Sequence, residues 1–244
     1  MTIGYIGMGL VLAALLFGLV PGAPPLNAPK ILDISEAAGV IDPAQMQAAD
    51  VGTVIVRASY GTQADGAALG YVAQLAAGGI PVAALYHDFD PAAPWADQYE
   101  VLAAAMRQTS VRRAALRLSE PGLSPANSAA VAAFMARLAS EFPLPLTYRH
   151  LIQTDAAAWQ ALGGPAWGAE YELWLAEPAE STAPAPNPLA PWRTWKLWQW
   201  TTEGDGAANG VSSAHVGISR FNGSALQFES WLKMAMVFGG GSGR

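Results

Sequence analysis

The chain has 244 residues, enough for one complete α/β barrel and few for two ordinary domains. Apolar residues make up 52% and charged residues 13%, which excludes a disordered chain, and a net charge of −6 without a basic run argues against a nucleic-acid partner. Cysteine is absent, which excludes a disulfide framework and a thiolate metal site.

The first segment is an uncharged apolar run, Ile3–Val20, which is long enough to cross a bilayer as a helix. Four prolines follow it and form a semi-rigid linker: Pro21, Pro24, Pro25 and Pro29. No Lys or Arg precedes Lys30, and no clear cleavage site is visible. We interpret the run as a hydrophobic N-terminal helix that acts as a retained membrane anchor. A cleaved signal peptide and a helix buried in a larger assembly are the alternatives.

Beyond the linker, short apolar strand candidates alternate with Ala-rich helical segments. Strands are expected at residues 30–34, 53–58, 81–87, 114–119, 145–148, 171–176, 195–200 and 215–221. Helices are expected at residues 66–77, 96–107, 125–142 and 154–162. This alternation predicts a parallel βαβ arrangement, with less helix between the last strands. We therefore divide the chain into a helix and linker (1–29), one barrel domain (30–238) and a flexible tail (239–244).

The strand candidate Trp195–Trp200 is rich in tryptophan. Its alternation puts Leu197 and Gln199 on one face and Trp198 and Trp200 on the other. Aromatic side chains at a strand end can stack on the apolar faces of sugar rings, whereas the alternative is that both tryptophans are ordinary core.

Six short motifs occur in order between Ile31 and Leu232. They are Leu32–Ser35, Gly39–Asp42, Val54–Thr62, Tyr86–Phe89, Leu173–Ala176 and Arg220–Gly223. In this order and over this length they resemble the family 25 glycoside hydrolases, the Chalaropsis-type lysozymes common in phage endolysins and bacterial autolysins. The resemblance implies an α/β fold, an irregular TIM-like (β/α)5β3 barrel, with its site at the carboxyl ends of the strands.

The resemblance also implies peptidoglycan glycan strands as the ligand and specific roles for several residues. Glu120 corresponds to the general acid/base and Asp33 to its charged partner. The expected substrate-binding residues are Tyr86, His87, Asp88, Trp174, Trp198 and Trp200. The alternative readings are a solvated loop carboxylate for Glu120 and a turn-forming Asp33. The three histidines lack metal-ligand spacing, and nothing indicates a metal or an organic cofactor.

Three positions depart from the family pattern. Leu118 stands where the family's Asp-x-Glu motif has Asp, Gly217 stands where an Asp precedes the closing motif, and Tyr60 replaces a frequent Glu. Leu cannot stabilise a developing cation, although Asp88 or Asp90 could take that place in space.

Two functions follow from this pattern. We favour a barrel that binds cell-wall glycan, or serves as part of a phage virion or envelope assembly, with weakened or lost muramidase activity. The alternative is an active muramidase, an endolysin, that hydrolyses the β-1,4 bond between N-acetylmuramic acid and N-acetylglucosamine through Glu120. Either function is compatible with a protein anchored in the membrane or exported to the periplasm or cell wall. A virion-associated protein that contacts a phage tail or membrane through Ile3–Val20 is the other localisation.

Overall fold

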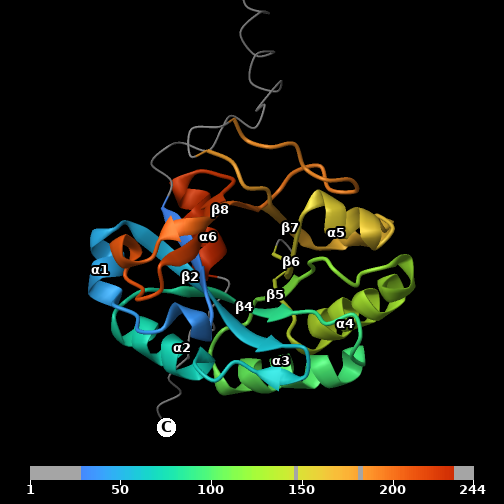
Figure 1. Ribbon diagram of the computed structural model, residues 1–244, viewed down its shortest axis with the longest axis horizontal. Coiled ribbons are helices and arrows are strands. Elements are labelled where there is room, and N and C mark those ends of the chain that lie inside the picture. The colour runs from blue at the N-terminus through green and yellow to red at the C-terminus, as the bar shows by residue number, and fades with distance from the viewer. Residues whose placement is uncertain (1–28, 146–147, 181–183, 234–244) are drawn as a thin grey trace, which may run out of the picture.

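The computed structural model describes residues 29–145, 148–180 and 184–233, which form a mixed α/β fold around a closed barrel (Figure 1). The strands are β1 (Lys30–Ile34), β2 (Val51–Tyr60), β3 (Gln63–Ala64), β4 (Val82–Asp88), β5 (Ala114–Arg117), β6 (Leu151–Thr154), β7 (Glu172–Ala176), β8 (Leu197–Asp205) and β9 (His215–Phe221). The α-helices are α1 (Pro43–Ala48), α2 (Ala68–Ala77), α3 (Trp95–Gln108), α4 (Ser128–Glu141), α5 (Ala156–Ala161) and α6 (Ala225–Lys233).

Eight of these strands close the barrel. β1, β2, β4, β5, β6, β7 and β8 pair in parallel in that order, and β9 pairs antiparallel with both β8 and β1. The short strand β3 is a hairpin extension of β2 outside the ring. The mixed α/β barrel expected from the sequence is therefore confirmed. Because seven strands run in parallel, the side chains at their carboxyl ends meet at one end of the barrel, which we call the mouth.

Two apolar layers result from the alternation of side chains along the strands. The inner layer fills the barrel and includes Ile31, Ile55, Tyr86, Ala115, Trp174 and Leu197. The outer layer lies between the barrel and its helices and includes Leu32, Val56, Leu116, Phe134, Leu173 and Trp198. Neighbouring residues of one strand thus belong to different layers, and this parity decides which side chains face the mouth.

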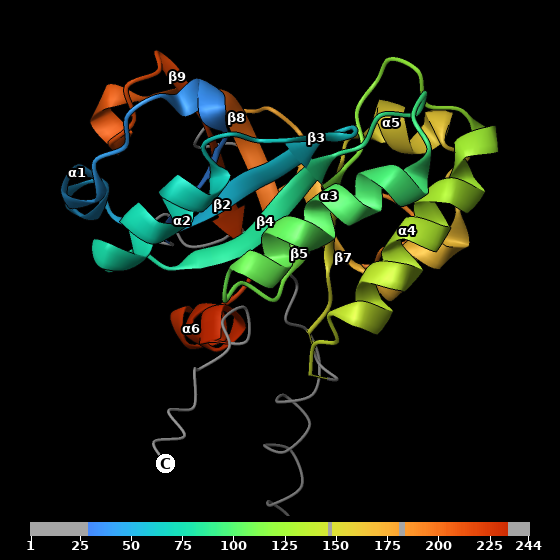
Figure 2. The same cartoon turned by 90° about the horizontal axis from the view of Figure 1, so that it is seen from below.

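Helix α6 closes the amino end of the barrel. Its residues Phe228 and Trp231 pack against Phe221 of β9, and the buried guanidinium of Arg113 lies 4.1 Å from the centre of the Trp231 ring. In Figure 2, the helices α2, α3 and α4 lie along the side of the barrel, and α6 lies apart from them. These aromatic side chains fill the interior of the barrel at its amino end.

Most expected elements appear with shifts of a few residues, but one strand was misplaced. Pro145 and Tyr148, the described residues of the expected strand 145–148, belong to no strand, and β6 lies at Leu151–Thr154 instead. The Tyr148 N–H donates to the carbonyl of Pro145, 2.8 Å away, rather than to a neighbouring strand.

The expected N-terminal helix, Ile3–Val20, lies outside the described residues. Among the helices of residues 29–145, 148–180 and 184–233, none is both long enough and apolar enough to cross a bilayer.

Candidate active site

A polar cavity of about 420 Å³ opens at the mouth of the barrel. Its lining comes from β1 and the residues 35–38 that follow it, from β4, β5, β8 and β9, and from the loop before β9. The polar and aromatic side chains that line it include Asp33, Tyr86, Arg117, Gln199 and His215. A carboxylate, a guanidinium and an amide therefore meet in one space, a suitable combination for hydrogen bonding to a ligand rich in hydroxyl and amide groups.

Asp33 is held in place by a chain of two amides. Gln153 donates from Nε2 to Oε1 of Gln199 over 2.9 Å, and Gln199 donates from Nε2 to Oδ1 of Asp33 over 2.8 Å. Because the Gln199 oxygen is occupied by Gln153, its amino group is directed at the carboxylate. The Asp33 side chain is thus oriented within the cavity.

Gly217 is the partner of Asp33 on the antiparallel strand β9. A side chain at position 217 would collide with the Asp33 carboxylate, which lies over the glycine. The local packing therefore requires glycine at position 217, because a larger residue there would force Asp33 to move.

The surroundings of Asp33 favour its protonated form. Burial raises the pKa of Asp33 from 3.8 to about 6, against the opposing effects of the Arg117 charge and the Gln199 hydrogen bond. The nearby charge of Asp88 acts in the same direction as burial. A carboxyl group with this pKa changes its charge close to neutral pH.

Asp88, at the end of β4, belongs to an ion-pair network across the mouth. Its Oδ2 lies 2.6 Å from Nη2 of Arg117 and 3.4 Å from Nη1 of Arg57. Arg57 also donates from Nε to Oδ2 of Asp65 over 2.8 Å, and the Arg117 guanidinium lies 4.9 Å from the centre of the Tyr86 ring. Because two cations neutralise two carboxylates here, Asp88 is engaged and is not a free base.

Glu120 lies beyond the end of β5, is exposed, and does not belong to the cavity lining. At the end of β5, Arg117 faces the cavity, whereas the next residue, Leu118, is 2% exposed and packs in the outer layer. Residues two apart on a strand share a face, so Arg117 lies on the inward face with Ala115. The strand ends there, and Ser119 is exposed and does not line the cavity. Neither Arg117 nor Ser119 carries a carboxylate.

The aromatic residues that were expected to bind the substrate are distributed over both layers. Tyr86 lines the cavity. Trp174 is fully buried in the inner layer, where it meets Tyr86 edge to face at 6.3 Å and donates from Nε1 to Oγ of Ser219. It therefore supports Tyr86 from within the barrel and does not line the cavity.

Trp198 and Trp200 face outward from β8. Trp198 is 1% exposed and donates from Nε1 to the carbonyl of Glu177 over 2.8 Å. Trp200 is partly buried against the outer layer, with the Arg220 guanidinium 5.4 Å from its ring centre. The expected contact of either ring with a ligand in this cavity does not fit these positions, because Leu197 and Gln199 take the inward face.

His87 also faces outward. Its Nδ1 lies 2.8 Å from Oγ of Ser59, its Nε2 lies 3.0 Å from Oε1 of Gln98, and its ring stacks on Phe134. Burial lowers the pKa of His87 to about 4, so the ring is neutral at physiological pH. Both ring nitrogens have partners within the protein, which does not fit the expected hydrogen bond to a substrate.

Three of the cavity residues named above were not predicted from the sequence: Arg117, Gln199 and His215. For Arg117 and Gln199 the available signal was the strand alternation, since Arg117 follows Ala115 by two residues and Gln199 follows Leu197 by two. In the described part of the chain, no three His, Asp or Glu side chains gather closely enough to hold a metal ion.

A closed barrel with a polar cavity at the carboxyl ends of its parallel strands is the architecture of many barrel enzymes. The family model "Glycosyl hydrolases family 25" matches residues 32–208. The chain therefore belongs to glycosyl hydrolase family 25.

Solved structures agree on the fold. A bacterial lysozyme from Streptomyces coelicolor superposes with a TM-score of 0.70 at 22% identity, covering 84% of this chain and 97% of that one. A family 25 glycosyl hydrolase from Bacillus anthracis gives 0.68 at 15% identity, with 84% and 93% covered. The endolysin CTP1L gives 0.67 at 20% identity, with 84% and 69% covered. A search of curated proteins gives no significant match.

Proposed function

We propose that this protein is a peptidoglycan-directed family 25 barrel that binds glycan strands at its mouth and has weakened or lost muramidase activity. Membership of the family supports peptidoglycan as the ligand class, and several of the similar structures are described as lysozymes or endolysins. The barrel is taken as a TIM-like (β/α)5β3 variant, whose ligands bind at the carboxyl ends of the strands.

The proposed loss of activity rests on one observation, the position of Arg117 on the inward face of β5. Hydrolysis of a glycosidic bond generally uses two carboxyl groups that flank the scissile bond. We propose that the family's Asp-x-Glu motif corresponds to Arg117-Leu118-Ser119, one residue earlier than the match that ends at Glu120. The cavity then keeps Asp33 and lacks the general acid.

The size of the expected loss follows from electrostatics. Removing one preorganised group costs on the order of 10²–10³ in rate, and here an inward carboxylate is replaced by a cation. Arg117, which is paired with Asp88, supplies no negative charge to an oxocarbenium-like transition state, whereas Asp33, Gln199 and Tyr86 can still contact a sugar in the ground state. Rate should therefore fall more than affinity.

The alternative is an active muramidase in which Glu120 is the acid/base and Asp33 its partner. The exposed position of Glu120 beyond β5 disfavours this role, because a proton donor must reach the leaving oxygen inside the cavity. The activity would require the loop that carries Glu120 to fold over the mouth.

Localisation at the cell envelope belongs to the same proposal. The uncharged run Ile3–Val20 would anchor the protein in a membrane or a phage assembly, residues 30–238 would form the glycan-binding domain, and residues 239–244 would be a tail. Export to the cell wall is consistent with the lysozymes and endolysins among the similar structures.

The test is muropeptide release from purified peptidoglycan by the full chain, next to co-sedimentation with the same peptidoglycan. The S. coelicolor lysozyme is the positive control, and Glu120→Gln is the matched variant. We expect binding by both forms of this protein and release near background. Robust release that Glu120→Gln abolishes would establish the muramidase instead, and absence of both binding and release would indicate a structural role.

A further inference from the structure

We propose that Tyr60 forms a second saccharide subsite beside the cavity, a stacking platform for a neighbouring sugar ring of the glycan strand. Tyr60 is 55% exposed at the carboxyl end of β2. This inference rests on the proposed glycan binding and adds a location and a recognition mode to it.

The direction of the Tyr60 side chain follows from an irregularity in the pairing of β2 with β4. Arg57 pairs with Tyr86 and Ser59 with His87, so β2 has one more residue than β4 between these two pairs. Such a bulge reverses which face the following side chains take. Ser59 consequently faces outward beside His87, and Tyr60 takes the side of its partner Asp88.

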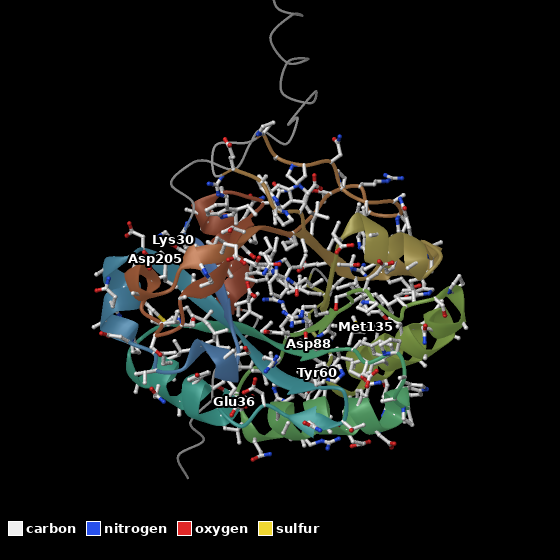
Figure 3. The ribbon with its side chains drawn as sticks, in the orientation of Figure 1. Lys30, Glu36, Tyr60, Asp88, Met135 and Asp205 are labelled. Atoms are coloured by element: carbon white, nitrogen blue, oxygen red, sulfur yellow. The ribbon has the colours of Figure 1, made fainter. Side chains whose placement is uncertain are left out.

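The position of Tyr60 at the mouth follows from this pairing. Asp88 faces the mouth, where it binds Arg57 and Arg117. Figure 3 shows Asp88 and Tyr60 next to each other, with Glu36 on the same side of the molecule. The exposed ring therefore belongs to the end of the barrel where the cavity opens.

Tyr60 lines a separate hollow of about 240 Å³ together with Glu36, Arg57, Gln63 and Asp65. Its floor is fixed, because the Asp65 carboxylate accepts from Arg57 Nε and from the backbone N–H of Glu36. The side chains of Glu36 and Gln63 are exposed and make no hydrogen bond to other described residues. They can bind sugar hydroxyl and acetamido groups while the ring packs on the sugar face.

The ion-pair network connects this hollow with the cavity. Arg57 lines the hollow, Arg117 lines the cavity, and both bind Asp88 between them. A glycan strand whose one sugar contacts Asp33 in the cavity can thus extend over this network to Tyr60. The ligand class is a β-1,4-linked N-acetylhexosamine chain of at least two rings.

The experiment is calorimetric titration of the full chain with tetra-N-acetylchitotetraose and with a glucosaminyl-muramyl tetrasaccharide. Tyr60→Ala and Tyr60→Leu should weaken binding by roughly three- to tenfold, because they remove the flat ring, whereas Tyr60→Phe should bind like the unaltered chain. Leu226→Ala is the matched control, since Leu226 is 73% exposed on α6 at the opposite end. Circular dichroism of each variant verifies the fold.

Two results would overturn the subsite in distinguishable ways. If the unaltered chain binds and Tyr60→Ala and Tyr60→Leu bind equally well, the subsite is wrong and the proposed function stands. If the unaltered chain binds neither oligosaccharide, the proposed function fails and the subsite fails with it. A loss in Tyr60→Leu that Tyr60→Phe does not share supports stacking specifically.

Discussion

The inward and outward faces of the same strand ends differ sharply in chemistry. On β5, Arg117 faces the cavity and pairs with Asp88, whereas its neighbour Leu118 is buried in the apolar outer layer. On β4, Asp88 takes part in the ion-pair network at the mouth, whereas its neighbour His87 is a neutral ring stacked on Phe134. Of two adjacent residues at a strand end, one can therefore contact a ligand and the other packs between the barrel and its helices.

This contrast shows how the family pattern maps onto a strand. A motif match gives an approximate position, but the two-residue period decides whether the side chain reaches the mouth. Substitutions on the two faces test this contrast directly.

Leu118→Asp should destabilise the protein by about 3 kcal/mol or more, because it puts a carboxylate without a partner into the outer apolar layer. Ser119→Asp, at the exposed neighbouring position, is the control and should change stability by about 0.5 kcal/mol or less. Denaturant unfolding of the two variants measures the difference. Equal stability of both would show that Leu118 does not face the outer layer.

Arg117→Ala should cost about 1–2 kcal/mol, because it leaves the largely buried Asp88 with only the longer contact to Arg57. Arg137→Ala is a suitable comparison, since Arg137 pairs with the half-exposed Glu100 and also lies over a tyrosine ring. It should cost about 0.5 kcal/mol, as surface ion pairs do. Thermal unfolding at low salt measures both, and equal losses would contradict a special role for the network at the mouth.

Local strand and helix patterns predicted the parallel βαβ arrangement, and the family resemblance implied the closed barrel. The apolar stretches that became β1, β2, β4 and β7 have no competing pattern, and their order matches the family. β6 was not predicted from the sequence because its four residues include Gln153 and Thr154, which are polar yet buried. Their burial results from barrel closure, and no local pattern encodes closure.

The site was only partly predictable for the same physical reason. Asp33 and Tyr86 were found because their motifs place them at strand ends on the inward face. The alternation of Trp198 and Gln199 was visible, but the choice of inward face depends on the neighbouring strands β7 and β9. The bulge that turns Tyr60 toward the mouth depends on pairing with β4 and has no signature in β2 itself.

Asp33 gives a pH-dependent prediction for the inward face. Its folded pKa of about 6 exceeds its ordinary value of 3.8, so the folded state binds the proton more tightly than the unfolded state. The resulting stabilisation is fully present below about pH 4 and is lost as the pH rises through 6. Relative to Asp33→Asn, the unaltered protein should therefore lose about 1 kcal/mol between pH 4 and pH 7, allowing for its partial exposure.

Denaturant titrations of both proteins across this range measure the difference. His87 and His150, whose pKa values burial lowers to about 4, destabilise both proteins on acidification and cancel in the comparison. A constant difference between the two proteins from pH 4 to pH 7 would refute the raised pKa of Asp33.

Trp200→Ala should leave glycan affinity unchanged within about twofold. Trp200 faces outward beside Arg220 on β8, whereas Tyr60 lies at the mouth beside Asp88. Titration of Trp200→Ala and Tyr60→Ala with the same tetrasaccharide compares two partly exposed aromatic side chains on opposite faces of their strands. If exposed aromatic area alone determined glycan binding, both substitutions would weaken it similarly. A loss in Trp200→Ala alone, with the fold intact, would place the glycan over the outward face of β8 and reverse the contrast between the two faces.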